Sequence, residues 1–119
     1  MMQITETQLK KQVGDRLQYG MNQGKLYFDR LNSGEVIEVR GKTRRRVKLC
    51  REGTADFYIL KKLHLMAGII STRIIFLELK SVKGKQRSEQ GAFQKLVEAV
   101  GGEYHIIRSI EDLEKALDL

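Results

Sequence analysis

A glutamate and a lysine close an apolar run in the stretch FLELKSVKG, residues 76–84. If 73–80 forms a β-strand, alternate side chains share a face, so Glu78 and Lys80 point the same way, roughly 6.6 Å apart along the strand. Buried charges are costly unless they are paired or bound to a metal ion. A strand end that leaves the core explains the pair as well, because E-x-K is common by chance.

A second carboxylate makes a chemical role more attractive. Asp56 lies in the predicted strand ADFYIL, residues 55–60. If this strand pairs antiparallel with 73–80, Asp56 lies beside Glu78. Two acids at adjoining strand ends repel each other unless a cation lies between them.

The first predicted helix contributes a third carboxylate. At 100° per residue, Glu6 falls in the middle of the apolar stripe formed by Leu9, Val13 and Leu17. A glutamate in the first turn also suits the helix dipole. The dipole explains why Glu6 occurs in the first turn but not why it lies on the apolar face of the helix. Gln90, in the first turn of another predicted helix, is a fourth candidate, although glutamine there can equally be a cap or face solvent.

Carboxylates from separate elements that converge with a lysine suit phosphodiester hydrolysis. Asp and Glu oxygens bind Mg²⁺ or Mn²⁺, and these ions take phosphate oxygens and water as further ligands. The ion lowers the pKa of a bound water and neutralises developing charge. An ammonium group such as that of Lys80 can orient the water or stabilise the transition state.

The elements that must position these residues follow from periodicity and end signals. Thr5 and Gln8 have capping-box spacing before the first helix, and Ser109 precedes the last one as an N-cap. The pattern predicts the order α-β-β-β-β-α-β-α in one domain, 1–119, with a mixed sheet flanked by helices. The predicted elements are helix 5–20, strands 25–31, 35–39, 55–60 and 73–80, helix 88–100, strand 103–109 and a helix after Ser109.

The sequence also predicts the structure of two connecting segments, the turn at 32–34 and the insert at 61–72. The turn signal NSG, residues 32–34, predicts that 25–31 and 35–39 pair as a hairpin, and the basic segment after them is expected to stay extended. The apolar insert 61–72 is long for a hairpin loop. It either extends the two flanking strands or forms a contact surface for another subunit.

Charge favours a polyanionic partner. Lys and Arg outnumber Asp and Glu by 22 to 15, which gives a net charge of +7 and an isoelectric point near 9.7. The excess is clustered, which a uniformly solvated surface does not need, and this favours nucleic acid. Seven of the residues between positions 40 and 51 are basic (Arg40, Lys42, Arg44, Arg45, Arg46, Lys48 and Arg51), and Lys80, Lys83, Lys85 and Arg87 form a second group.

Several function classes find no support. The chain has no apolar span of membrane length and no signal-like start, so we expect an intracellular protein that does not enter a membrane. A single cysteine, Cys50, excludes an internal disulfide. His64 and His105 lack metal-ligand spacing with each other or with Cys50. The GKT at 41–43 lacks the glycine that a phosphate-binding loop needs five residues earlier.

The combined motifs resemble a known family. GTAD at 53–56, ELK at 78–80, Gln90 ahead of an aromatic residue, and Glu6 occur in the order found in PD-(D/E)XK nucleases. The chain is most similar to their VRR-Nuc branch, in its short stand-alone form from phages and bacteria. The resemblance, which includes the tail GGEYHIIRSIEDLEKAL, covers about residues 4–117.

The resemblance implies a restriction-endonuclease-like core and a set of site residues. Asp56, Glu78 and the backbone carbonyl of Leu79 would bind Mg²⁺ or Mn²⁺, Lys80 would be catalytic, and Glu6 and Gln90 would support them. From the charge clusters we expect the backbone of DNA to contact Arg44, Arg45, Arg46 and Lys48, with Lys83 and Lys85 nearer the scissile phosphate.

The implied activity is that of a structure-specific DNA endonuclease similar to Holliday-junction resolvases. Such an enzyme makes two symmetric cuts, which a two-fold homodimer supplies, and the insert 61–72 is the candidate interface. The expected setting is the cytoplasm of a bacterium or of a phage-infected host. The alternative is a non-catalytic basic module that only binds nucleic acid, which explains the charge equally well but not the placement of the acids.

Overall fold

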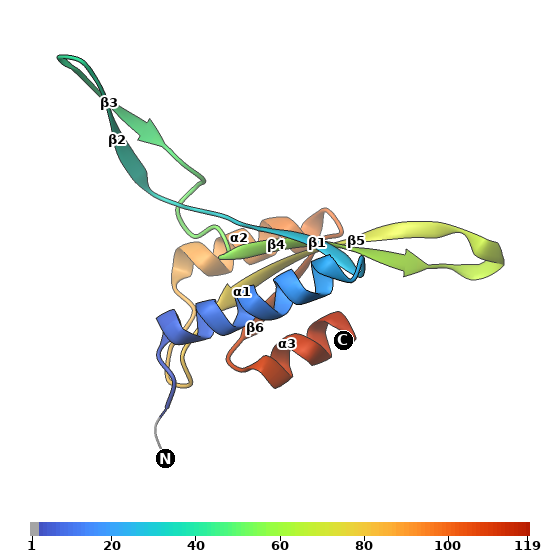
Figure 1. Cartoon of the computed structure of the whole chain (residues 1–119). Coiled ribbons are helices and arrows are strands. Elements are labelled where there is room, and N and C mark those ends of the chain that lie inside the picture. Colours follow the sequence, from blue (N-terminus) through green and yellow to red (C-terminus); the bar gives the residue numbers. More distant parts are fainter. Residues whose placement is uncertain (1–2) are drawn as a thin grey trace.

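The computed structural model describes residues 3–119, which form a four-stranded mixed sheet with helices on both faces and a separate two-stranded sheet (Figure 1). The larger sheet has the strand order β1-β4-β5-β6; β5 is antiparallel to β4 and parallel to β6. The helical elements are α1 (Glu6–Asn22), the short 3-10 turn η1 (Met66–Gly68), α2 (Ser88–Ala99) and α3 (Ile110–Leu117). The strands are β1 (Leu26–Arg30), β2 (Glu35–Arg40), β3 (Thr43–Lys48), β4 (Phe57–His64), β5 (Ile70–Leu79) and β6 (Glu103–Ile107).

The predicted class, a mixed sheet flanked by helices, is confirmed. Parallel β5 and β6 need a long connection between them, and α2 supplies it. None of the helices within residues 3–119 is long and apolar enough to cross a membrane.

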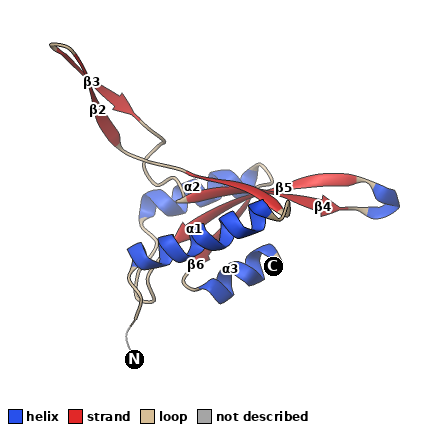
Figure 2. Cartoon of the chain, in the orientation of Figure 1, coloured by secondary structure: helices blue, strands red, loops and turns tan. Residues whose placement is uncertain are grey.

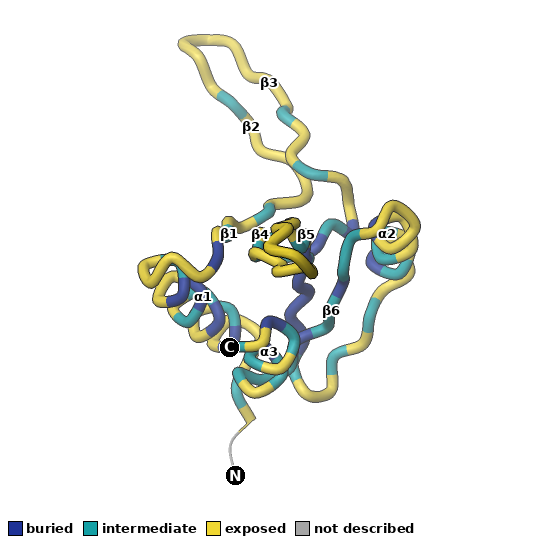
Figure 3. The backbone as a smooth tube through the Cα atoms, turned by 90° about the vertical axis from the view of Figure 1, so that its right-hand side faces the viewer, coloured by how far each residue is buried: buried dark blue, intermediate teal, exposed yellow. Residues whose placement is uncertain are grey.

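Helices α1 and α3 cover one face of the sheet, and α2 covers the other (Figure 3). The main core lies under α1 and α3. It buries the predicted stripe of α1 completely, together with the alternate residues of β5 that share one face. These residues are Leu9, Val13 and Leu17 of α1, Ile75, Leu77 and Leu79 of β5, and Leu113 and Leu117 of α3.

Glu78 lies on the opposite face of β5, as the alternation of side chains along a strand predicts. Phe76 packs edge-on against Phe93 of α2, with ring centroids 5.3 Å apart. Phe93 also contacts Tyr104 of β6, at 6.1 Å. These aromatic contacts fix α2 over the face from which Glu78 projects.

The predicted helix starts are confirmed. The backbone N–H of Thr5 donates to Gln8 Oε1 at 2.8 Å, and the N–H of Gln8 donates to Thr5 Oγ1 at 3.1 Å, which is a capping box. Before α3, Ser109 Oγ accepts from the N–H of Asp112 at 3.2 Å. These caps fix where α1 and α3 begin relative to the sheet.

The predicted hairpin between 25–31 and 35–39 is wrong. β1 pairs antiparallel with β4, and β2 pairs with β3 through the two-residue turn Gly41–Lys42. The reason is burial: Leu26 and Phe28 of β1 pack on the core, whereas no residue of β2 is buried. The basic segment is extended, as predicted, and forms the partner of β2 in a hairpin that projects from the body (Figure 2).

The insert 61–72 extends the two strands that flank it, which was the first of its two interpretations. β4 and β5 pair without interruption from Phe57↔Leu77 to His64↔Ile70, and η1 closes the tip (Figure 2). The tip is apolar yet exposed: Met66 is 88% exposed and Ile69 59%.

An ion-pair network joins β5, β6 and the end of α3. Arg73 donates from Nε and Nη2 to the two carboxylate oxygens of Glu103, both at 2.8 Å, and from Nη2 to the carbonyl of Ala116 at 2.9 Å. The hydrogen bonds from Arg73, with a smaller contribution from His105, lower the pKa of Glu103 from 4.5 to about 2.

We expect Glu103→Gln to lower the free energy of unfolding by about 1–2 kcal/mol at pH 7, allowing for partial exposure. A carboxyl whose pKa is lower in the folded state stabilises the fold above pH 4.5 and loses this effect as the pH falls towards 2. Urea unfolding across that pH range should therefore show that the difference in free energy of unfolding between the wild-type protein and Glu103→Gln becomes smaller as the pH falls. Glu98→Gln, on the exposed side of α2, is the control, and a difference that is constant with pH would contradict the account.

Candidate active site

Asp56 and Glu78 meet where β4 begins and β5 ends. The N–H of Asp56 donates to the carbonyl of Leu77 at 2.9 Å, which continues the β4–β5 ladder by one residue. Asp56 Oδ2 accepts from the N–H of Leu79 at 2.7 Å. The Asp56 carboxylate is therefore held against the backbone segment that contains Glu78, Leu79 and Lys80.

Glu78 is a buried carboxylate with one unsatisfied oxygen. It is 2% exposed. Oε1 accepts a hydrogen bond from Gln90 Nε2 and lies 3.8 Å from the Lys80 ammonium, whereas Oε2 is buried and has no hydrogen-bond partner in residues 3–119. Burial, followed by repulsion from Asp56, raises the pKa of Glu78 from 4.5 to about 7.

Gln90 fixes the orientation of Glu78 from the first turn of α2. Its Oε1 accepts from the N–H of Arg87 at 2.9 Å, so its Nε2 must be the atom that faces Glu78. Gln90 is 3% exposed. A buried glutamine bonded at both ends holds a carboxylate more firmly than a solvent-facing cap residue could.

Lys80 is held beside Glu78 by the chain that follows β5. Its side chain is 10% exposed, and its backbone N–H donates to the carbonyl of Ile107 at 3.0 Å. The following loop is held by Arg108, whose Nη1 donates to the carbonyls of Ser81 and Gly84 at 2.7 and 2.6 Å. Gly84 of this loop lies against the Lys80 stem, since a Cβ at Gly84 would stand 3.4 Å from Lys80 Cβ and Cδ, while the ammonium lies near Glu78.

Glu6 lies at the edge of this group. It is the first residue of α1 and is exposed, so it is not buried with the stripe that follows it. Its negative charge nevertheless contributes to the raised pKa of Glu78, after the effects of burial and of Asp56. Glu6 therefore acts on Glu78 electrostatically, from an exposed position.

Lys10 is a member of the cluster that the sequence did not single out. Its Nζ lies 3.2 Å from Asp56 Oδ1. On a helical wheel Lys10 falls only about 40° from Glu6, just beyond Leu17 at the edge of the apolar stripe. The reasoning that found Glu6 could therefore have found Lys10, had cations on the stripe been sought as well as acids.

Gly53 allows the loop before Asp56 to lie against α2. Its φ is +86°, and a Cβ at this position would stand 2.4 Å from the carbonyl oxygen of Glu89. Only glycine suits both the backbone conformation and this close approach. The contact places the first turn of α2, and with it Gln90, next to the strand ends.

We expect Gly53→Ala to destabilise the protein by at least about 2 kcal/mol, because both the backbone strain and the clash oppose it. The matched control is Gly14→Ala in α1, where a Cβ meets nothing within 4 Å and should stabilise the helix by about 0.5–1 kcal/mol. Thermal unfolding of the two variants checks this. Equal and small effects would contradict the assigned role of Gly53.

The predicted DNA-contacting residues fall into two separate places. Lys83 and Lys85 are exposed on the loop after Lys80, close to the carboxylate cluster in sequence. The other residues are exposed on the projecting β2–β3 hairpin and are not brought to the cluster; they are Arg44, Arg45, Arg46 and Lys48.

The donor set fits the expected metal ion. Glu78 has a buried oxygen, Oε2, without a hydrogen-bond partner in residues 3–119, and the Asp56 carboxylate is close enough to raise the pKa of Glu78. Hard oxygen donors of this kind are what Mg²⁺ and Mn²⁺ prefer. Residues 3–119 contain no group of three or more His, Cys, Asp or Glu side chains placed to bind a metal. The predicted metal site does not require three such side chains, because its third protein ligand would be the backbone carbonyl of Leu79.

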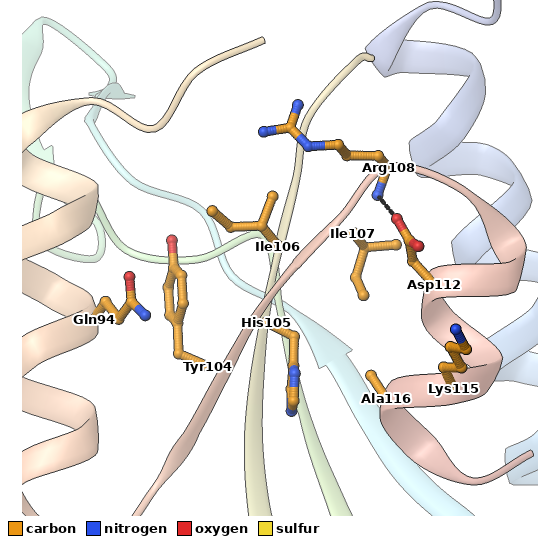
Figure 4. A pocket seen from close by; sticks show the side chains of 9 residues that line it. All are labelled: Gln94, Tyr104, His105, Ile106, Ile107, Arg108, Asp112, Lys115 and Ala116. Atoms are coloured by element: carbon orange, nitrogen blue, oxygen red, sulfur yellow. Dashed lines mark hydrogen bonds between the residues drawn. The ribbon is translucent and has the colours of Figure 1, made fainter. Parts of the chain in front are cut away.

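A cavity of about 610 Å³ lies away from this cluster, along the free edge of β6 between α2 and α3 (Figure 4). Gln94 and Tyr104 line one side and Asp112 and Lys115 the other. Its carboxylate, Asp112, is already engaged at the start of α3, where Oδ2 accepts from the N–H of Arg108 at 2.9 Å. The chemical groups that could cooperate are therefore at the β4–β5 end and not in this cavity.

Comparison of the chain with protein-family models, curated proteins and solved structures gave no match. The resemblance of the motifs to the VRR-Nuc branch therefore stays a prediction, and the function must be argued from the geometry of the site.

Proposed function

We propose that this protein is a metal-dependent, structure-specific DNA endonuclease with a PD-(D/E)XK-type site, in which Asp56, Glu78 and Lys80 carry the chemistry. The observation that supports this most strongly is the buried Glu78 carboxylate. One of its oxygens has no partner, and it lies beside a second acid and a lysine. Such an arrangement costs folding free energy, and a cation bound there offsets that cost.

Asp56, Glu78 and the carbonyl of Leu79 would hold Mg²⁺ or Mn²⁺. When bound, the ion supplies charge neutralisation at the scissile phosphate and lowers the pKa of its own water. Gln90 keeps Glu78 Oε1 engaged, which leaves Oε2 for the ion. Lys10 balances the charge of Asp56 from the other side.

Lys80 is the proposed catalytic residue. Its ammonium is the one cationic group of the cluster attached directly to the strand that carries Glu78, and it is largely shielded from water. A shielded donor of this kind hydrogen-bonds to an attacking water or a phosphate oxygen and stabilises charge that develops there. Glu6, which is exposed, would support a water at the solvent side of the site.

A homodimer with two such sites is part of the proposal, because resolving a four-way junction needs two symmetric cuts. The chain offers an apolar tip at Met66 and Ile69. It also offers an apolar groove of about 530 Å³ between β5 and α2, lined in part by Ile74, Phe93 and Val100. The tip of one copy could thus seat in the groove of the other, and sedimentation that finds only monomer at working concentrations would count against it.

The alternative, a basic module that binds nucleic acid without cutting it, accounts for the exposed cations equally well. It gives no reason for an acid that is 2% exposed with an unsatisfied oxygen. Surface phosphate contacts need no buried carboxylate.

The direct test incubates the protein with labelled four-way junctions, linear duplex and single strands, in Mg²⁺, in Mn²⁺ and in EDTA. We expect cleavage that requires the metal and favours the branched substrate. Asp56→Asn should abolish cleavage, whereas Asp15→Asn, an exposed acid on α1, should not alter it. Binding to DNA without metal-dependent cleavage of any substrate would support the alternative.

A further inference from the structure

The projecting β2–β3 hairpin has two chemically different faces. In a two-stranded ribbon, directly paired residues lie on the same face and successive pairs alternate. The register therefore assigns every residue of the hairpin to one face or the other. Face A carries the pairs Glu35↔Lys48, Ile37↔Arg46 and Val39↔Arg44, and face B carries Val36↔Val47, Glu38↔Arg45 and Arg40↔Thr43.

The cations of face B are already engaged in ion pairs. Glu38 forms ion pairs with both Arg40 and Arg45, the latter at 3.0 Å. Glu38 and Val47 are also the two half-buried residues of the hairpin strands, and both lie on face B. Face B therefore has fewer cations available to a partner than face A.

Face A presents cations that are available to a partner. Arg44 and Lys48 make no ion pair or side-chain hydrogen bond within residues 3–119, and Arg46 makes only a long contact of 3.9 Å to Glu35. Between these cations lie Ile37, 63% exposed, and Val39, 59% exposed. Unpaired cations beside exposed apolar side chains suit contact with a DNA groove, in which the cations bind phosphates at the rims and the apolar side chains face the base edges at the floor.

Face A also leads towards the carboxylate cluster. The residue pair of face A nearest the body of the protein is Glu35 and Lys48, and it lines a cavity of about 550 Å³ together with Arg51 and Arg87. The corresponding pair of face B, Val36 and Val47, does not line this cavity. The N–H of Arg87 bonds to Gln90, which in turn bonds to Glu78. This cavity, lined by Lys48, Arg51 and Arg87 together with Glu35 and Glu52, therefore joins face A to the turn of α2 that supports the candidate active site.

We propose that the hairpin enters the major groove of B-form duplex DNA with face A towards the bases, and so holds one duplex arm while the carboxylate cluster meets the backbone. The major groove, about 12 Å wide, admits a two-stranded ribbon, while the minor groove at about 6 Å does not. The inference rests on the proposed function in that it takes DNA as the substrate. It adds which surface grips the duplex, which groove is entered, and which face is used.

The chain provides a matched pair of variants for the test. Arg44→Gln with Arg46→Gln removes two charges from face A, and Arg40→Gln with Arg45→Gln removes two from face B of the same hairpin. Of the four hairpin cations that the charge clusters assigned to DNA, the inference keeps Arg44, Arg46 and Lys48. It reassigns Arg45, which lies on face B and is paired with Glu38. Duplex affinity is measured in EDTA over a range of salt concentrations. Guanine N7 protection from methylation reports the major groove, and adenine N3 protection reports the minor groove.

For the face A variant we expect the slope of log affinity against log salt to fall by about 2 and the affinity to fall about 10-fold or more. Its guanine N7 protection should disappear, whereas the face B variant should keep both protection and slope. Double-stranded RNA of the same sequence should bind weakly, because its major groove is too narrow for the hairpin.

Equal losses in the two variants, or protection at adenine N3 only, would overturn the inference, and so would equal binding of RNA and DNA. These outcomes are distinct from failure of the proposed function. A protein that cleaves DNA in Mn²⁺ but fails the face comparison keeps the function and loses the inference. A protein that binds no DNA at all loses both.

Discussion

Replacing Lys80 with methionine is expected to slow DNA cleavage by about 10²–10³-fold while the protein stays folded and still binds DNA. The stem of Lys80 lies under the loop held by Arg108, and methionine fills much of the same space without the ammonium. The loss therefore reports the charge and not the packing. Single-turnover cleavage at saturating Mn²⁺ measures the rate, and duplex binding in EDTA measures the affinity.

Two further variants make the Lys80 result specific. Lys11→Met removes an exposed lysine of α1 and should leave cleavage unchanged. Lys80→Arg should not restore the rate, since the larger guanidinium does not fit a site whose side chain is 10% exposed. Full activity of Lys80→Met would exclude this residue from the chemistry.

Glu78→Gln is expected to abolish cleavage and yet stabilise the metal-free protein by about 1–2 kcal/mol at pH 8. The pKa of Glu78 is raised to about 7 from 4.5, so the stability due to this group is complete below pH 4.5 and is lost as the pH rises through 7. An amide in its place carries no charge to desolvate and can still accept the hydrogen bond from Gln90.

Urea unfolding in EDTA at pH 5 and pH 8 measures this effect, and the gain should be larger at pH 8. Adding Mn²⁺ should raise the stability of the wild-type protein but hardly that of the variant, because a ligand stabilises only the state that binds it. Glu98→Gln is the exposed control. A variant less stable than wild type at both pH values would contradict the description of Glu78 as a buried carboxylate with an unsatisfied oxygen.

The site follows from the sequence where local rules control it. Strand alternation placed Glu78 and Lys80 on one face and Leu79 on the other, and the antiparallel pairing of β4 and β5 brought Asp56 to Glu78. Helix periodicity placed Gln90 only near the edge of the buried stripe of α2 and left a cap or a solvent-facing position open; in the structure it is buried and also caps α2. Periods of two and of 3.6 residues need no knowledge of the rest of the chain.

The rest depends on long-range choices that local signals do not encode. NSG and Gly41–Lys42 are both acceptable turns, and only the competition for a place beside β4 decides that β1 pairs with β4 and β2 with β3. The contact of Gly53 with Glu89 joins two elements far apart in the sequence. The pairing of Lys10 with Asp56 likewise needs the position of α1 over the strand ends.

Titration of Mn²⁺ followed by electron paramagnetic resonance tests the central claim, that the Asp56–Glu78 cluster is a metal-binding centre, most directly. The free Mn²⁺ signal should be lost saturably with the wild-type protein and with Asp15→Asn. For Asp56→Asn and for Glu78→Gln the affinity should be at least about 10-fold weaker. Identical titrations for all four proteins, or no binding by the wild type, would contradict the account.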